Sequence, residues 1–445
     1  MTAGAVSLGL LGSCLSVAQA AAAPVRGSDT TAVQTTGDAV PLERDSVLLP
    51  ENLDESSQAL DDELSLPLPE ALEGEASELA TPALGEDEPV TEEFSSPDPQ
   101  AGSAAAQAAC RTQLAAAQAA DSDSPVACVQ WGTSAPAADL RAAVDAWPVP
   151  KWCDDHGANG KWYVNRFKAC GIFPADLTVT NPRTGAVVGK MHYLTRAYAY
   201  SARDVKTWAY QVELLEVNSS GVAKGSSAVG SGTCAGKCKV TKSTFPSQAM
   251  SKSKEPVGQF FLDTTIKTSP KGQKGDGQAT AAWTFTNPAW AGPSTQMKLP
   301  TPAVRCDNAL PGTSKPGCVM PHIPEMAYAK NGEYPELAKH IAYAQNTKKL
   351  PGKHGTKSYL SRLTDKKKIK ENRSKACPAS LKRPKGKQCD EYPFASTWQG
   401  AKTGGGKFSR RMIDGRQNEE GGKALGRFYL YNRIIEKDKF LVWIK

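Results

Sequence analysis

Residues 389–397 read Cys-Asp-Glu-Tyr-Pro-Phe-Ala-Ser-Thr, and the C-terminal part of the chain is organised around this stretch. Two adjacent carboxylates, Asp390 and Glu391, directly follow a cysteine and precede a run of aromatic, proline and aromatic residues. Pro393 restricts its own backbone and that of the residue before it. The stretch therefore holds two acids beside apolar anchors, a pattern typical of a site rather than of a solvated surface.

A second polar cluster lies at residues 417–422, which read Gln-Asn-Glu-Glu-Gly-Gly. Its glycine pair allows a close backbone approach or a positive φ. We expect this cluster and residues 389–397 to form one pocket.

A helix is predicted at residues 334–344, where a proline is acceptable in the first turn. Leu337, Ile341 and Ala344 recur at helical spacing and define its buried face. His340 is predicted to lie at the edge of that face. On the residues alone it is either a satisfied core histidine or part of a site.

Four pieces of this part of the chain, taken in order, resemble the NucA/NucB-type secreted deoxyribonucleases of bacteria. They are Tyr334-Pro335-Glu336 with Lys339-His340-Ile341, Glu371-Asn372-Arg373, residues 389–395, and Asn418 with Gly422. Glu419-Glu420 depart from the family, in which a small or basic residue often follows the asparagine. The resemblance implies a small α+β domain over residues 301–445 and a secreted enzyme that hydrolyses DNA phosphodiester bonds with little sequence preference.

The resemblance also implies roles for individual residues. The catalytic candidates are Asp390, Glu391, His340 and Asn418, with His340 as general base or phosphate contact and Asn418 as a neutral ligand or water-orienting group. Glu419 is a further candidate, at the position where the chain departs from the family. Hard oxygen ligands suit Mg²⁺ or Mn²⁺, so Asp390 or Glu391 is expected to bind a divalent metal ion. Neighbouring side chains leave opposite faces of a strand. One acid would therefore bind metal or activate water, and the other would contact backbone or Arg373.

A basic run at residues 339–387 holds 16 Lys or Arg against two acids, Asp365 and Glu371. Such a run is usually a solvated face, but a net charge of +14 directly before the carboxylate motif suits a surface that follows phosphates. The predicted nucleic-acid contacts are Arg373, Lys366, Lys367, Lys368, Lys382 and Arg383. DNA is the expected partner, and the chain is expected to be a monomer.

The N-terminus predicts export. Residues 1–23 have the pattern of a signal peptide, with Ala18-Gln19-Ala20 as its cleavage site. Leu11-Gly12-Ser13-Cys14 also resembles a lipoprotein box, which would tether the chain through Cys14. Release is the preferred interpretation, and no other stretch is apolar and long enough to predict a membrane span.

The segment at residues 24–108 is predicted to be disordered. From Asp38 to Asp98 it holds 19 acids against one base, Arg44. Such a composition cannot bury enough apolar surface to offset its ordering entropy. The residues after position 98 carry 51 bases and 26 acids, a net charge of +25. The acidic segment is therefore either a solubilising linker or a pro-segment that competes with DNA for this basic body.

Residues 109–300 are expected to form Ala-rich helices followed by an all-β domain. One or two short helices are predicted around Cys110 and Cys128. From about residue 152, runs rich in Val, Thr, Tyr, Trp and Phe alternate with turn signals, as in an antiparallel sandwich. Their aromatic residues are core in most such strands, and the alternative is a surface that binds a cell-wall polymer or nucleic acid.

The ten cysteines that remain after residues 1–23 predict disulfides in an exported protein. Their spacing favours five sequential pairs: Cys110 with Cys128, Cys153 with Cys170, Cys234 with Cys238, Cys306 with Cys318, and Cys377 with Cys389. A zinc site at Cys234 and Cys238 is the competing interpretation.

The predicted fold is therefore multidomain, with a disordered acidic N-terminal segment, a sandwich-like all-β middle domain and a small α+β C-terminal nuclease domain. Two other functions remain open. A polysaccharide or peptidoglycan hydrolase would use a carboxylate pair such as Asp390 and Glu420. A non-catalytic adhesin would act through the β domain.

Overall fold

The structure, a computed structural model, describes residues 92–94, 99–132 and 146–445. The predicted signal peptide, the lipoprotein box at Cys14 and most of the acidic segment lie outside the described residues. Within the range predicted to be disordered, the structure describes a short strand at Glu92–Phe94 and the beginning of a helix at Pro99.

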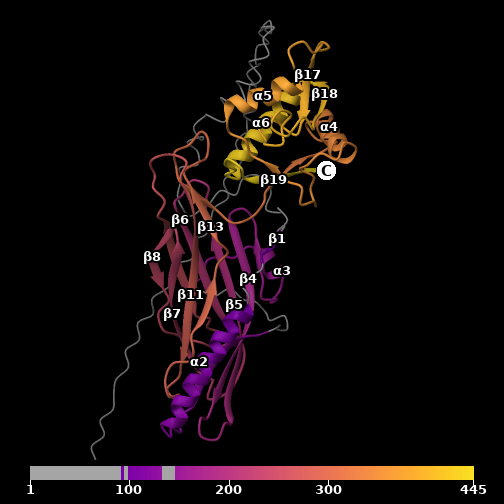
Figure 1. Cartoon of the computed structure of the whole chain (residues 1–445). Coiled ribbons are helices and arrows are strands. Elements are labelled where there is room, and N and C mark those ends of the chain that lie inside the picture. The colour runs from indigo at the N-terminus through magenta and orange to yellow at the C-terminus, as the bar shows by residue number, and fades with distance from the viewer. Residues whose placement is uncertain (1–91, 95–98, 133–145) are drawn as a thin grey trace, which may run out of the picture. The chain divides into compact units, whose positions relative to one another are not determined.

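Two antiparallel sheets make up the β region, which we define as strands β1 to β14 (Figure 1). The first sheet contains β1 (Glu92–Phe94), β2 (Val126–Trp131), β3 (Trp162–Val164), β4 (Lys168–Thr180), β5 (Val187–Tyr200), β6 (Thr207–Gly221), β8 (Cys238–Thr244) and β10 (Val257–Thr264). The second contains β7 (Ser227–Gly236), β9 (Gln248–Ala249), β11 (Lys274–Thr286), β12 (Met297–Pro300), β13 (Val304–Asp307) and β14 (Gly317–Val319).

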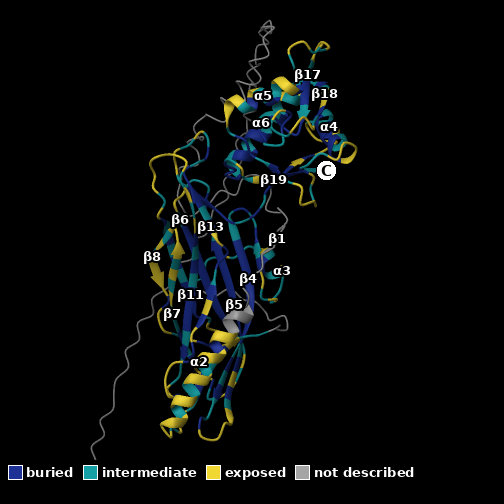
Figure 2. Cartoon of the chain, in the orientation of Figure 1, coloured by how far each residue is buried: buried dark blue, intermediate teal, exposed yellow. Residues whose placement is uncertain are grey.

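One apolar core is shared by both sheets. Tyr193 of β5 and Phe285 of β11 meet with their ring centroids 5.0 Å apart, and Trp162, Trp208 and Trp283 are fully buried. Figure 2 shows the central strands β4 and β5 as largely buried. This arrangement confirms the sandwich-like all-β prediction and places most of the strand aromatics in the core. Among the described residues the only exposed large hydrophobic side chains are Val187 and Val205.

The Ala-rich stretch forms one helix, α2 (Pro99–Ala119), and the prediction of a helix around Cys128 is wrong. Cys128 lies on β2, whose Val126 and Val129 are buried against the sandwich, and Cys110 of α2 is bonded to it. A further short helix, α3 (Lys151–Asp155), carries Cys153.

All five cysteine pairs are those that the spacing predicted. Cys234 and Cys238 form a disulfide between β7 and β8, so the zinc interpretation of this pair is wrong. In the described part of the chain no helix is long and apolar enough to cross a membrane.

The C-terminal region, defined here as β15 to β19, combines three helices with two small sheets. Its elements are β15 (Glu325–Tyr328), α4 (Pro335–Asn346), β16 (Leu360–Ser361), α5 (Lys366–Ala376), β17 (Lys387–Tyr392), β18 (Ser409–Asp414), α6 (Gly415–Tyr431) and β19 (Lys439–Ile444). The apolar strand β19 lies between β15 and β16, as its composition predicted, and β17 pairs with β18. A separate apolar cluster, including Leu337, Ile341, Phe428 and Phe440, holds these elements together.

Strands β13 and β14 fall inside the range 301–445 that was expected to form the C-terminal domain. β13 pairs with β11, so these residues complete the second sheet of the β region. The division of the chain at residue 301 remains a prediction.

Buried His322, between β14 and β15, predicts a pH dependence of stability. Burial and the charge of Arg166 lower the pKa of His322 from 6.5 to about 3. Between these two values the unfolded chain binds a proton that the folded chain does not, so the free energy of unfolding falls as pH decreases from about 6.5 towards 3. His322→Gln should remove roughly 2 kcal/mol of the loss between pH 7 and pH 4.5. Thermal unfolding of both proteins at the two pH values measures this, and equal losses would contradict it.

Candidate active site

The candidate site is built on the hairpin of β17 and β18 and on the helix that follows it. Asp390 pairs with Arg411, and Tyr392 pairs with Ser409, across the hairpin. Helix α6 begins directly after β18, where the Asp414 carboxylate accepts a hydrogen bond from the Gln417 N–H at 3.1 Å. The disulfide between Cys377 and Cys389 ties β17 to the end of α5.

His340 lies between Asp390 and Ser409. Its Nδ1 is 2.5 Å from Asp390 Oδ2, and its Nε2 is 2.9 Å from Ser409 Oγ. With Asp390 ionised, Nδ1–H donates to the carboxylate and Nε2 accepts from the serine hydroxyl. The side chain has 0 % exposure, so the prediction that His340 lies at the edge of the buried face is wrong. The ring, which α4 carries, is fully buried against the hairpin, where Asp390 of β17 and Ser409 of β18 provide its polar partners.

Glu391 leaves the opposite face of β17 from Asp390, as alternation in a strand requires. One of its carboxylate oxygens lies 3.7 Å from the Cys377 sulfur, and the Ala395 N–H donates to the carboxylate. Burial, followed by the neighbouring charge of Asp390, raises the pKa of Glu391 to about 7, and Arg373 of α5 opposes that shift. Glu391 is half-buried: its carboxylate contacts the end of α5, and part of the residue stays open to solvent.

Asn418 and Glu419 contact β17 through Gln388. The Asn418 amide donates to Gln388 Oε1 at 3.0 Å, and the Gln388 amide donates to the Glu419 carboxylate. Gln388 is two residues before Asp390 and therefore shares its face of the strand. Asn418 and Glu419 therefore contact the residue directly before the stretch 389–397, a residue that the sequence analysis did not single out. A pocket shared by the two stretches remains a prediction.

The glycine pair lies inside α6 and serves close packing. A Cβ atom on Gly421 would lie 2.2 Å from Leu337 Cδ2 of α4. The Gly421 carbonyl accepts from the Tyr328 hydroxyl at 2.8 Å. Of the two explanations offered by the sequence, close approach applies at Gly421.

The predicted nucleic-acid contacts are dispersed. Lys366, Lys367 and Lys368 form the first turn of α5, and Lys368 Nζ lies 4.5 Å from the centroid of the Trp398 ring. Arg383 donates to carbonyl oxygens of its own loop, including Leu381 at 2.8 Å, while Lys382 is exposed. Within the described ranges, neither the three α5 lysines nor Lys382 and Arg383 form a hydrogen bond with the Asp390 or Glu391 side chain.

Three further residues were missed because their partners are distant in sequence. Ser409 contacts His340 but follows a glycine-rich loop that carries no helical or strand signal. Glu336, quoted in the resemblance without a role, pairs with Lys387 at 2.8 Å and accepts from the Asp414 N–H at 2.8 Å. These contacts join α4 to the open end of the hairpin, where Lys387 and Asp414 pair with each other. Asn372, quoted in the family resemblance without a role, is fully buried and bonds Ala395, Thr397, Lys402 and Thr403 in the loop after β17.

The carboxylates of β17 are the residues predicted to bind a metal ion. Across residues 92–94, 99–132 and 146–445, no three or more His, Cys, Asp or Glu side chains gather as they would around a metal ion. Asp390 and Glu391 point to opposite faces, so one ion would take one of them. These hard oxygen donors fit an ion such as Mg²⁺, which keeps most of its water ligands and is often bound through one or two carboxylates.

The comparison with protein families adds to this geometry. A family model described as deoxyribonuclease NucA/NucB matches residues 342–443, which include both strands of the hairpin and all of α6. His340 lies two residues before the matched range. A search of curated proteins found no match to the chain. The C-terminal region of this chain, over residues 342–443, therefore matches the deoxyribonuclease NucA/NucB family, and this match supports a nuclease.

Proposed function

We propose that this chain is an exported endonuclease that hydrolyses phosphodiester bonds of DNA with a divalent metal ion and little sequence preference. The observation that carries the proposal is the hairpin inside the family-matched range, which holds Asp390 and Glu391 with His340, Asn418 and Arg373 around it. The five disulfides support export, because disulfides persist in oxidising compartments.

Asp390 is the acid that we assign to the attacking water. Phosphodiester hydrolysis needs a positioned water, neutralised phosphate charge and help for the leaving oxygen. His340 fixes one oxygen of Asp390 and is itself fixed by Ser409, so the carboxylate is oriented before substrate binds. Because both ring nitrogens already have protein partners, we assign His340 a positioning role in place of the general-base or phosphate-contact role that the resemblance implied.

The other groups would bind phosphate and ion. Arg373 can contact a phosphate through two parallel N–H groups, and Asn418 can orient water from the same face as Asp390. Asp390 or Glu391 would hold Mg²⁺ or Mn²⁺, and that ion would neutralise charge on the phosphate. Glu419 is held by Gln388, so its proposed role is to fix the start of α6.

Two observations weigh against the alternative functions. Glu420, which a glycoside-cleaving carboxylate pair would need as the partner of Asp390, instead forms an ion pair with Lys423 along α6 at 3.1 Å. Most β-region aromatics lie in the core, and none of the described ones is among the exposed large hydrophobic side chains, which leaves an adhesin without its expected aromatic surface.

The proposal is tested by offering substrates of different classes to the purified full chain. Plasmid DNA, RNA and peptidoglycan are each incubated with Mg²⁺ or Mn²⁺, and with a chelator. DNA cleavage that the chelator abolishes is the expected result. Peptidoglycan cleavage that survives the chelator would replace the proposal with a hydrolase of sugars, and no cleavage of any polymer would favour the adhesin.

DNA binding should depend strongly on salt. Replacing Lys366, Lys367 and Lys368 by Gln removes charges from one turn of α5, and the slope of log affinity against log salt should fall by roughly 0.9 for each phosphate that the variant no longer neutralises. The matched control replaces three exposed lysines of the β region, Lys239, Lys252 and Lys254, by Gln. Binding of a labelled duplex at several salt concentrations measures both slopes. An equal change of slope in the two variants would show that the α5 lysines are solvated charges without a specific part in DNA binding.

A further inference from the structure

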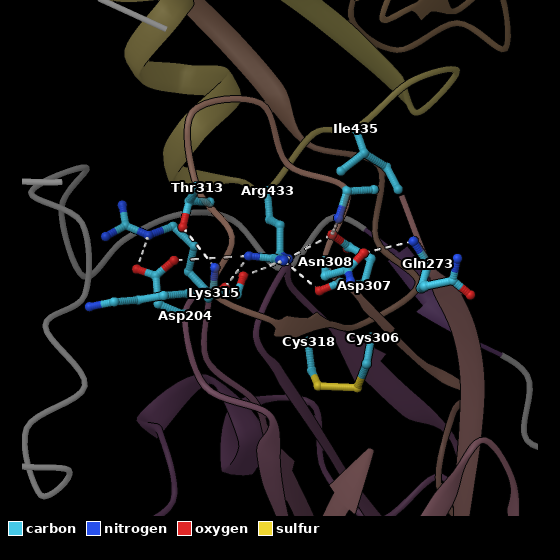
Figure 3. A network of polar contacts seen from close by, with 12 residues as sticks. Asp204, Gln273, Cys306, Asp307, Asn308, Thr313, Lys315, Cys318, Arg433 and Ile435 are labelled. Carbon is cyan, nitrogen blue, oxygen red and sulfur yellow. Dashed lines mark hydrogen bonds and ion pairs between the residues drawn. A yellow bond between two sulfur atoms is a disulfide. The ribbon is translucent and has the colours of Figure 1, made fainter. Parts of the chain in front are cut away.

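The turn between α6 and β19, residues 432–438, is held by three arginines that we call the arginine cluster: Arg166, Arg305 and Arg433. Arg433 belongs to the turn, has 0 % exposure and points into the β region (Figure 3). Its guanidinium donates to the carbonyl oxygens of Arg203 at 2.6 Å, Asp307 at 2.5 Å and Lys315 at 3.1 Å. It also pairs with the Asp307 carboxylate at 2.9 Å.

The other two arginines reach from the β region in the opposite direction. Arg166 donates to the Asn432 carbonyl at 2.6 Å and to the Arg433 carbonyl at 3.1 Å, and it pairs with Asp438 at 3.2 Å. Arg305 donates to the same Arg433 carbonyl at 2.9 Å and also pairs with Asp438. Each end of the turn is therefore bonded to the β region by a guanidinium group.

The acceptors of the cluster are fixed by the fold. Asp307 and Lys315 lie at and inside the loop that the Cys306–Cys318 disulfide closes between β13 and β14 (Figure 3). Burial lowers the pKa of Arg433, and the Asp307 charge opposes that shift. A buried cation is tolerated only when such partners surround it. Loss of Arg433 would remove its bonds to the Arg203 and Lys315 carbonyl oxygens. Loss of Arg166 would remove its bonds to the Asn432 and His322 carbonyl oxygens. Either change takes donors away from buried acceptors on both sides of the turn, so we expect the turn to move.

We propose that the β region positions helix α6 through the arginine cluster, and that it is thereby part of the working unit of the nuclease; this inference rests on the proposed function. Helix α6 is continuous over 17 residues, which makes it about 25 Å long. It ends at Tyr431, directly before the turn that the arginine cluster holds, and carries Asn418 and Glu419 near its beginning. A shift at its end is transmitted along a rigid helix to these residues.

Close packing in the middle of α6 makes the site sensitive to such a shift. Gly421 meets Leu337 of α4, the helix that also carries His340. Leu337 fits only because Gly421 has no side chain, so little space is left between α6 and α4. A movement of α6 towards α4 would therefore displace α4 and disturb the His340–Asp390 contact. The role of Arg166, Arg305 and Arg433 is therefore one of positioning, since their bonds go to the turn, to the β region and to His322 rather than to the candidate site.

The test compares two buried arginines of the β region in the full chain. Arg166→Met removes a member of the cluster. Arg196→Met is the matched control, because Arg196 is also buried but pairs with Glu213 and Asp154 inside the β region. For Arg166→Met we expect kcat for DNA cleavage per folded molecule to fall by about tenfold to 10²-fold at nearly constant KM. For Arg196→Met we expect a similar loss of thermal stability with kcat retained, and Arg166→Lys should recover part of the activity.

A second readout does not depend on DNA cleavage. Backbone hydrogen exchange of α6 should become at least several-fold faster in Arg166→Met and stay unchanged in Arg196→Met. If Arg166→Met does not fold, Arg305→Gln, whose side chain keeps 17 % exposure, is the milder variant for both readouts. Equal effects of the cluster and control variants on kcat and on α6 exchange would overturn the inference. A wild-type chain that cleaves no DNA would refute the proposed function alone, because exchange would still test the positioning of α6.

Discussion

Asp390→Asn is expected to lower the rate of DNA cleavage by about 10³-fold while the chain stays folded and binds DNA with nearly unchanged affinity. The substitution keeps the size of the side chain and an oxygen that can still accept from His340 Nδ1–H. It removes the negative charge that a water nucleophile or a metal ion requires. The loss should therefore fall on kcat rather than on KM.

Asp365→Asn is the control for that variant. Asp365 caps α5 in the same region, where its carboxylate accepts from the Lys368 N–H at 3.0 Å, and asparagine caps helices about equally well. Its activity should match that of the wild type. Single-turnover cleavage of a duplex by both variants, with a binding titration beside it, gives the comparison. Full activity of Asp390→Asn would remove this carboxylate from the mechanism.

His340→Ala is expected to lower both stability and turnover. It leaves the Asp390 charge buried without its partner, which typically costs about 3 to 5 kcal/mol, and it frees the carboxylate to rotate. We therefore expect the rate per folded molecule to fall by about 10²-fold. Ser409→Ala removes only the hydrogen bond to Nε2, so its rate should fall far less.

Two measurements separate a site role of His340 from a core role. Thermal unfolding gives the stability of each variant, and cleavage at a temperature where each remains folded gives its rate. A lower melting temperature with an unchanged rate per folded molecule would make His340 a core histidine only. A large loss of rate in Ser409→Ala would show that the serine contributes more than its hydrogen bond to the ring.

Local patterns in the sequence predicted much of the fold. The helix around Leu337 and Ile341, the central strand β19 and all five cysteine pairs follow from periodicity, apolar runs and spacing. Strands β7 and β8 were missed because β7 is rich in Gly and Ser, which have low strand propensity. In the fold, Gly230 and Gly232 leave room for the rings of Phe245 and Phe260, so tertiary packing outweighs local preference.

The candidate site was predictable to the extent that its residues are neighbours in sequence. The opposite orientation of Asp390 and Glu391 follows from strand alternation alone. The Ser409 contact to His340 joins residues 69 positions apart, and Gln388 joins two motifs that share no local pattern. The arginine cluster relies largely on backbone carbonyl oxygens, which every residue carries, so no sequence signal marks its acceptors.

Conversion of supercoiled plasmid by the purified full chain, with Mg²⁺ or Mn²⁺ and then with excess chelator, tests the central claim most directly. The account predicts relaxed and linear DNA in the presence of the metal, intact DNA after chelation, and intact DNA with Asp390→Asn under both conditions. Plasmid that stays supercoiled with either metal, or that is cut equally by wild type and Asp390→Asn, would contradict it.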